Sequence, residues 1–243
     1  MTLGGARQVR VVSLVPSVTE TLLQWGVVPV GCTRFCEQPE LVHVGGTKDP
    51  DIAAIVGLAP DLVVMCEEEN RRTDADALES AGLAVHSCSP RGVADVGPAL
   101  KALAEAIGSD SMTSPPTSTS TGAASDAPLG LTAFVPIWRR PWMTLAGDTY
   151  GSSVLATIGV TNVFAELSDR YPEVDLGAAQ RLAPDIVLAP SEPYPFRERH
   201  VEELSAVAPV LLLDGRDLFW WGVRTPTAID RLRSRIGAVT SVS

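Results

Sequence analysis

The segment PIWRRPW, residues 136–142, is the stretch of this chain with the most evident binding chemistry. It places two tryptophans and two arginines at the end of an apolar run. Indole rings stack on flat ligands, and guanidinium groups form paired hydrogen bonds with carboxylates or phosphates. The residue types therefore favour a site for a flat ligand with an anionic or amide-rich rim. The alternative is a packing element in which the arginines pair with surface acids.

A second aromatic group, DLFWWG, occupies residues 217–222. Neighbouring side chains on an extended segment point to opposite sides. We therefore expect one of Trp220 and Trp221 to be available to a ligand and the other to be buried under the last helix.

The segment CEEEN, residues 66–70, places three carboxylates on one loop after an apolar run. Such a loop is usually just solvated. Carboxylates can also coordinate a hard cation or accept hydrogen bonds from ligand amides. Both interpretations stay open.

Four cysteines lie in the first 90 residues, and two histidines, His43 and His86, lie in the same part of the chain. Together these side chains could bind a metal ion near the strand ends. Their spacing, however, is not that of a zinc knuckle or ribbon, and free cysteine is often a small buried apolar residue. In a cytoplasmic chain of this size the cysteines need not form disulfides. We expect inert core cysteines at the following positions: Cys32, Cys36, Cys66 and Cys88.

The sequence contains none of the common catalytic motifs. No Gly-x-Gly-x-x-Gly follows the first apolar run, and there is neither a Walker loop nor a Gly-x-Ser-x-Gly elbow. The segment GGTKD, residues 45–49, lacks the helix-opening context of a P-loop. The sequence therefore predicts a protein that is not an enzyme and that has no intrinsic cofactor.

The composition excludes some classes of partner. The formal net charge is −10, and an acidic surface repels nucleic acid and anionic membranes. No apolar run reaches the roughly 18–20 residues that span a bilayer. The first 17 residues have no apolar core followed by a small-residue cleavage site. As written, the chain is expected to be cytoplasmic, or extracytoplasmic if the true start lies upstream.

Short β-branched runs alternate with helical patterns along the chain, which predicts an α/β fold with parallel sheets. A Ser-x-x-Glu capping box at 17–20 predicts a helix that begins at Ser17. The predicted strands are 9–15, 28–32, 61–66, 83–88, 131–137, 185–190 and 210–214. The predicted helices are 17–25, 49–58, 73–82, 92–107, 151–159, 175–182, 197–206 and 224–236.

The chain repeats one short phrase, GLAPDLVVMC at 57–66 and RLAPDIVLAP at 181–190. In each copy a helix ends at Leu-Ala, proline prevents its continuation, and a buried strand follows. The repeat predicts two similar Rossmann-like lobes, 9–108 and 131–238. The segment between them, 109–130, is rich in Ser, Thr, Pro, Gly and Ala, which predicts a flexible linker.

The segments RVVSLVPSVTETLLQWGVVPVGCT and VGGTKDPDIAAIVGLAPDLVVMC resemble the helical-backbone metal receptor family, and so does GDTYGSSVLATIGVTNVF in the second lobe. These are the binding proteins for cobalamin, haem and ferric siderophores that serve ABC importers. The resemblance covers 9–236 apart from the linker. The opening Pro-Ser-x-Thr-Glu segment is most similar to the cobalamin-binding branch.

The resemblance implies a solute-binding protein that takes a cobalt or iron chelate in a cleft between the lobes. The site would lie at the carboxyl ends of the strands, as in open parallel sheets generally. The implied ligand-binding residues are Pro16, Ser17, Phe35, Cys66, Glu67, Trp138, Arg139, Arg140, Trp142, Asp148, Thr149, Tyr150, Tyr194, Asp217, Trp220 and Trp221. Of these, Cys66 is the candidate to coordinate the metal.

The sequence departs from the family pattern in two places besides its N-terminus. The family joins its lobes by one long helix, and here the linker stands in that place. The family also docks on an ABC permease through one exposed Glu on each lobe, where the helices 51–57 and 175–182 carry Ala. The nearby acids are displaced: Asp49, Asp51, Glu173 and Asp175. These departures keep an alternative open, an intracellular carrier, sensor or biosynthetic enzyme on the same scaffold.

Overall fold

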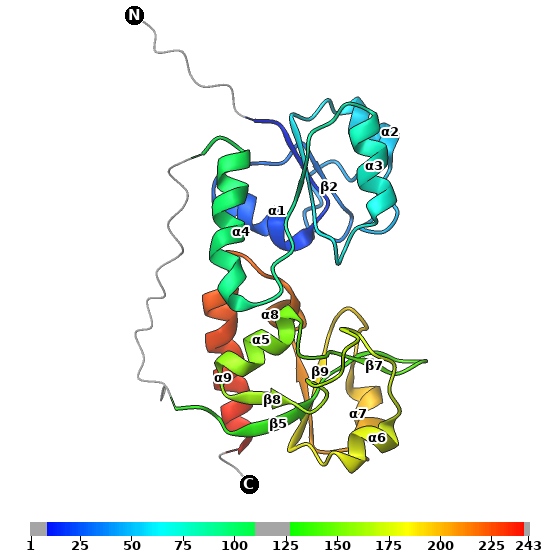
Figure 1. Ribbon diagram of the computed structural model, residues 1–243, viewed down its shortest axis with the longest axis vertical. Coiled ribbons are helices and arrows are strands. Elements are labelled where there is room, and N and C mark those ends of the chain that lie inside the picture. The colour runs from blue at the N-terminus through cyan, green and yellow to red at the C-terminus, as the bar shows by residue number, and fades with distance from the viewer. Residues whose placement is uncertain (1–8, 110–126, 241–243) are drawn as a thin grey trace, which may run out of the picture. The chain divides into compact units, whose positions relative to one another are not determined.

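The structure is a computed structural model that describes residues 9–109 and 127–240. The described residues form two compact units (Figure 1). Unit 1 comprises residues 9–89 and 96–109, and unit 2 comprises residues 90–95 and 127–240. Most of the predicted linker falls outside the described residues, so the domain boundaries given above stay a prediction.

Unit 1 is built on a four-stranded parallel sheet with the order β2-β1-β3-β4. The helices α1 and α4 lie to one side of the strands, and α2 and α3 lie to the other (Figure 1). The residues Val93–Asp95 at the start of α4 group with unit 2. The element bounds are β1 Val11–Ser13, α1 Pro16–Gln24, β2 Gly31–Cys32, α2 Ile52–Gly57, β3 Leu62–Met65, α3 Arg72–Ser80, β4 Val85–Ser87 and α4 Val93–Ala106.

Unit 2 is built on a second four-stranded parallel sheet, with the order β10-β9-β5-β8. A two-stranded antiparallel hairpin, β6–β7, follows β5. The bounds are β5 Leu131–Phe134, β6 Pro136–Trp138, β7 Met143–Thr144, α5 Tyr150–Thr157, β8 Val160–Asn162, α6 Leu176–Arg181, β9 Ile186–Pro190, η2 Glu198–His200, α7 Val201–Leu204, β10 Val210–Leu213, α8 Arg216–Phe219 and α9 Thr225–Thr240.

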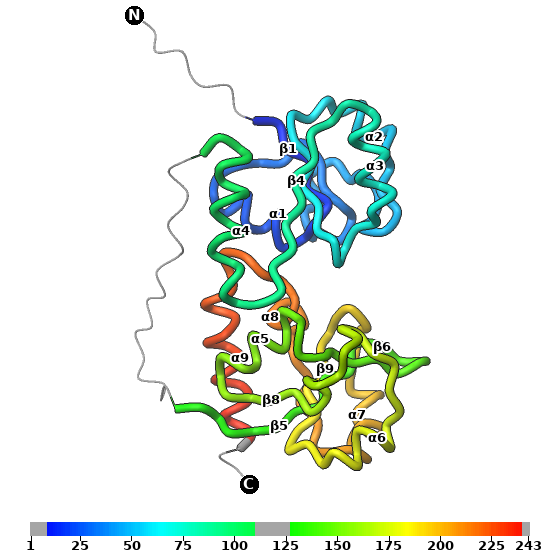
Figure 2. Tube along the Cα trace, viewed as in Figure 1, coloured from blue at the N-terminus to red at the C-terminus, as the bar shows by residue number. Residues whose placement is uncertain are grey.

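The two sheets have the same connectivity. In each sheet, counted in chain order, the first strand pairs with the second and third strands of that sheet, and the fourth strand pairs with the third. The tube trace in Figure 2 can be followed through both units by colour. The predicted α/β fold and the internal repeat are therefore confirmed.

The repeated phrase adopts one local structure in both units. The helices α2 and α6 are capped by Asp51 and Asp175, whose side chains accept the amide N–H three residues on. Each helix ends before a left-handed alanine, Ala59 with φ 45° and Ala183 with φ 47°. The buried strands β3 and β9 follow. Two of the acids near the expected docking positions are thus helix caps.

The predicted capping box at Ser17 is wrong. The N-cap of α1 is Val15, and Pro16 occupies the first helical position, which its fixed φ suits. Ser17 therefore lies inside the first turn and is buried, and its hydroxyl has no hydrogen-bond partner among the described residues.

Three elements differ from the sequence predictions. The strand β8 was not predicted because its three residues follow α5 directly through the left-handed Gly159. The hairpin β6–β7 was predicted only as the end of a longer strand. Residues 216–219 form the short helix α8 rather than an extended segment. Among the described residues, no helix is both long enough and apolar enough to cross a membrane.

Candidate functional site

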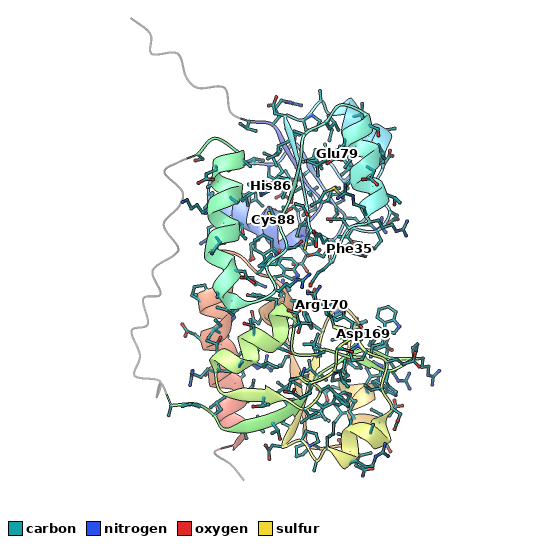
Figure 3. All side chains as sticks on the ribbon, viewed as in Figure 1. Phe35, Glu79, His86, Cys88, Asp169 and Arg170 are labelled. Carbon is teal, nitrogen blue, oxygen red and sulfur yellow. The ribbon has the colours of Figure 1, made fainter. Side chains whose placement is uncertain are left out.

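The parallel topology brings the predicted residues of unit 1 to one edge of its sheet. Pro16 and Ser17 follow β1, Phe35 follows β2, and Cys66 and Glu67 follow β3. Phe35 is 51% exposed, which is unusual for a phenylalanine, and Figure 3 labels it together with Cys88, which follows β4. This edge therefore offers an exposed aromatic ring, and the guanidinium of Arg34 lies 4.8 Å from the ring centroid.

A buried amide, Asn70, holds the loops of this edge in place. Its side-chain oxygen accepts the N–H of Cys66 at 2.8 Å. Its nitrogen donates to the carbonyls of Leu14 at 3.2 Å and Thr47 at 2.9 Å. One side chain thus joins the segments after β1, β2 and β3. The sequence analysis missed this role, and the only signal was the asparagine that closes the acidic segment.

The acidic loop is tied to its neighbours by its backbone. Glu67 is exposed, and its N–H donates to the hydroxyl of Ser89 at 3.0 Å. Lys48 donates to the carbonyl of Glu68 at 2.8 Å. In residues 9–109 and 127–240, no group of three or more His, Cys, Asp and Glu side chains is placed to hold a metal ion.

The four cysteines are buried and free, as predicted. Burial raises the pKa of the Cys66 thiol to about 11, and the nearby Glu69 adds to the shift. A thiol must lose its proton to bind a metal. Cys66 is therefore a poor ligand at neutral pH unless the metal itself displaces the proton, and its metal role stays a prediction.

In unit 2, the hairpin β6–β7 carries the Trp/Arg segment and separates its two tryptophans. Trp138 is 44% exposed and meets Tyr194 edge to face at 5.6 Å between ring centroids. Trp142 stacks on Phe196 at 6.0 Å and packs against the core of the unit. One tryptophan is therefore available to a ligand, and the other stabilises the fold.

The arginines of the segment are also separated. The Nε of Arg139 donates to a carboxylate oxygen of Glu203 at 2.9 Å, as the packing alternative predicts. Arg140 lies at the turn of the hairpin with φ 69° and is exposed. Arg139 therefore follows the packing interpretation of this segment, whereas Arg140 lies on the surface, as the binding interpretation requires.

Two other arginines surround Asp148. The guanidinium of Arg91 lies 3.1 Å from the Asp148 carboxylate. Arg170 donates to the backbone carbonyl of Asp148 at 2.7 Å and lies 3.7 Å from its carboxylate. The sequence analysis missed both arginines because they are distant from Asp148 along the chain. Two guanidinium groups therefore lie beside one carboxylate.

Two more of the predicted residues of unit 2, Tyr150 and Asp217, connect its helices. The hydroxyls of Tyr150 and Thr225 are 2.9 Å apart, and burial raises the pKa of Tyr150 to about 12. Asp217 is buried and forms an ion pair with Arg231 of α9. These side chains join the starts of α5 and α8 to α9. Their position favours a structural role.

The tandem tryptophans divide as predicted. Trp221 is buried, and its indole nitrogen has no hydrogen-bond partner in the part of the chain that the structure describes. Trp220 is half-buried, and the guanidinium of Arg224 lies 5.2 Å from its ring. Trp220 is therefore the less buried of the two tryptophans, and its part in ligand binding stays a prediction.

Residues 11–206 match the family model of the periplasmic binding proteins. Since this match covers most of the chain, the chain belongs to that family of solute-binding proteins, whose members are normally periplasmic. The predicted family is confirmed.

Among curated relatives, the vitamin B12-binding protein of Salmonella choleraesuis (strain SC-B67) is 26% identical over 175 residues. That alignment covers 68% of this chain and 66% of the relative, just under two thirds of its length.

Solved structures agree on the fold. The periplasmic vitamin B12-binding protein of Vibrio cholerae superposes with a TM-score of 0.73 at 21% identity, over 95% of this chain and 98% of the other. A periplasmic haem-binding protein of Pseudomonas aeruginosa gives 0.75 at 19% identity, over 93% and 92%.

Proposed function

We propose that this protein is a solute-binding protein that binds a metal chelate of the corrinoid or haem type, without catalysis, for ABC-type uptake. The ligand would be held by stacking and by hydrogen bonds to its charged or amide rim. A ferric siderophore belongs to the same class of ligand, because it too is a bulky chelate of a transition metal.

One observation supports this proposal most directly, namely the exposed aromatic rings at strand ends. Phe35 after β2 and Trp138 in the hairpin after β5 are each about half exposed. A large apolar side chain left in water at the ligand-binding edge of a parallel sheet favours a flat apolar partner.

The charges agree with the same class of ligand. Arg91 and Arg170 flank Asp148, and Arg140 is exposed on the hairpin. Guanidinium groups bind carboxylates and phosphates in a paired geometry. Relatives and structural neighbours named for vitamin B12 and haem support this choice of ligand.

Tryptophan fluorescence tests the proposal. The purified protein is titrated with cyanocobalamin, haemin and a ferric siderophore in turn, with inner-filter correction. We expect saturable quenching at micromolar ligand or below for at least one of them. The absence of saturable quenching by all three ligands would count against the proposal.

Two variants form a matched pair for this titration. Trp138→Phe removes the exposed indole and should reduce the quenched fraction. Trp25→Phe removes the tryptophan at the C-terminal end of α1, which is the opposite end of that helix from Pro16 and Ser17. Trp25→Phe should leave both the affinity and most of the quenching unchanged.

A further inference from the structure

The loop after β2 brings two cysteines together. Cys32 is the last residue of β2, and a turn follows in which the N–H of Cys36 donates to the carbonyl of Thr33 at 3.1 Å. The two cysteines lie four residues apart around this turn, and the interaction between their side chains is the largest influence on the pKa of each. Both side chains are buried, and Cys36 is 3% exposed. No other described cysteines are so close along the chain.

The sulfur of Cys36 is surrounded by hydroxyl groups. The Oγ1 atoms of Thr19 and Thr33 each lie 3.2 Å from it. The oxygen of Thr33 accepts the N–H of Phe35 at 3.3 Å, so its own proton remains available to the sulfur. Hydrogen bonds to a sulfur favour its charged form.

These contacts shift the pKa values of the two thiols in opposite directions. The Cys32 thiol and the two threonines lower the pKa of Cys36 below its usual range. The pKa of Cys32 is raised, first by its hydrogen bond to Cys36 and then by burial. These contacts therefore favour loss of the proton from Cys36 before Cys32.

The other two cysteines provide an internal comparison. Burial raises the pKa of Cys66 to about 11 and that of Cys88 to about 12. The Cys66 sulfur lies 4.0 Å from the hydroxyl of Ser89. Cys66 and Cys88 thus lack the close hydroxyl contacts that surround Cys36.

We propose that Cys36 is a thiol-oxidation site and that Cys32 is its resolving partner, so that the pair closes into a disulfide in the presence of a small-molecule disulfide. The Cys36 thiolate attacks one sulfur of the oxidant, forms a mixed disulfide and releases one thiolate. Cys32 then loses its proton and attacks the Cys36 sulfur, which releases the second thiolate. Two cysteines are oxidised and one small disulfide is reduced to two thiols.

The loop itself offers a route for the oxidant. The neighbours of Cys36 in sequence, Phe35 and Glu37, are exposed, and so is Arg34. A small opening of this turn would expose the sulfur. The proposal does not depend on which ligand the protein binds.

The sequence makes the test direct, because trypsin places each cysteine in its own peptide. Cleavage after Arg34 separates Cys32, in 11–34, from Cys36, in 35–48. Cys66 lies in 49–71 and Cys88 in 73–91. The reduced full-length protein is equilibrated with mixtures of reduced and oxidised glutathione, quenched, alkylated and analysed by mass spectrometry. We expect peptides 11–34 and 35–48 to be joined and to separate on reduction.

Variants assign the roles of the two cysteines. Cys32→Ser should leave a stable glutathione adduct on peptide 35–48, while Cys36→Ser should give neither a disulfide nor an adduct on peptide 11–34. Cys66→Ser is the matched control and should close the 32–36 pair at the wild-type rate. In the wild type, Cys36 should be modified at least about tenfold faster than Cys66.

Three results would overturn the proposal. The first is that peptides 11–34 and 35–48 of the wild-type protein are not joined even in the most oxidising glutathione mixture. This result needs no variant. The second is a disulfide that joins 49–71 to 73–91 instead. The third is a Cys32→Ser protein that carries no adduct on Cys36, which would remove the attacking role.

Discussion

At the scale of single residues, the molecule separates groups that hold the structure from groups that are free to bind. Trp142, Arg139 and Asp217 look like binding residues in the sequence, but each contacts a partner within its own unit. Phe35 and Trp138 keep exposed rings. Residue type predicted the candidates, while burial and pairing distinguish their roles.

The two tryptophans of the hairpin provide the first prediction. Trp142→Ala should destabilise unit 2 by about 3 kcal/mol, because it leaves a cavity beside Phe196. Trp138→Ala should change stability by less than about 1 kcal/mol and weaken ligand binding. Urea denaturation and ligand titration of both variants measure the two effects. If both variants were equally destabilised, the division of roles would be wrong.

The buried amide of Asn70 provides the second prediction. Asn70→Ala removes three hydrogen bonds and leaves buried backbone groups without a partner, which should cost unit 1 about 2–4 kcal/mol. The matched control is Glu67→Ala on the exposed side of the same loop. Trp25 is the only tryptophan of residues 9–89 and 96–109, so its fluorescence follows the unfolding of unit 1. Equal midpoints for the variant and the control would contradict this role.

At the scale of elements, the repeated phrase specifies one helix–turn–strand unit twice. An aspartate before the phrase caps each helix, a left-handed alanine ends the helix, and the aspartate within the phrase bonds to the start of the neighbouring strand. That second contact joins Asp61 to the N–H of Arg10 at 2.9 Å in unit 1, and Asp185 to the N–H of Thr132 at 2.7 Å in unit 2. The sequence repeat is therefore a repeat of hydrogen bonds.

The left-handed alanines provide the third prediction. A residue with a side chain pays about 1 kcal/mol at positive φ, whereas glycine adopts this conformation freely. Ala59→Gly and Ala183→Gly should therefore each raise the stability of their own unit by up to about 1 kcal/mol. The matched control, Ala53→Gly inside α2, should lower it by about as much. Thermal denaturation of the three variants measures these changes in stability. A loss of stability in Ala59→Gly and Ala183→Gly would contradict the assigned backbone conformation.

The pH dependence of unit 2 provides the fourth prediction. Hydrogen bonds from the backbone and side chain of Thr132 lower the pKa of Asp185 below its usual value of 3.8. A carboxyl whose pKa is lower in the folded state stabilises the fold above its unfolded pKa, and this contribution is lost as the pH falls through the folded pKa. The stability of unit 2 should therefore decline below about pH 4.

The control for this pH effect is Asp185→Asn, which removes the titrating group. The variant should be less stable than the wild type at neutral pH, and the difference should shrink as the pH falls below 4. A difference that stayed constant from pH 7 to pH 3 would exclude Asp185 as a source of the pH dependence.

At the scale of the whole molecule, the sequence predicted what depends on local pattern. The apolar runs at 61–66 and 185–190 and the repeated phrase were enough for the parallel sheets and their duplication. The three-residue strand β8 was missed because so short a run carries no periodicity of its own. The helix start at Pro16 was missed because the adjacent Ser-x-x-Glu pattern predicts a later N-cap.

The candidate site was predictable only in part. Residues that directly follow strands, such as Phe35 and Cys66, could be placed at a sheet edge from the order of elements alone. The arginines around Asp148 come from segments 57 and 22 residues away, and only the folded chain brings them together. The role of Asn70 has the same origin, since it depends on contacts with two other loops.

The central claim is that this protein binds a corrinoid-type or haem-type metal chelate. Equilibrium dialysis tests it most directly, because these coloured ligands can be quantified by absorbance on both sides of the membrane. We expect at least one of cyanocobalamin, haemin and a ferric siderophore to be retained at one ligand per chain, with half-saturation at micromolar concentration or below. Equal ligand concentrations on both sides for all three would contradict the claim.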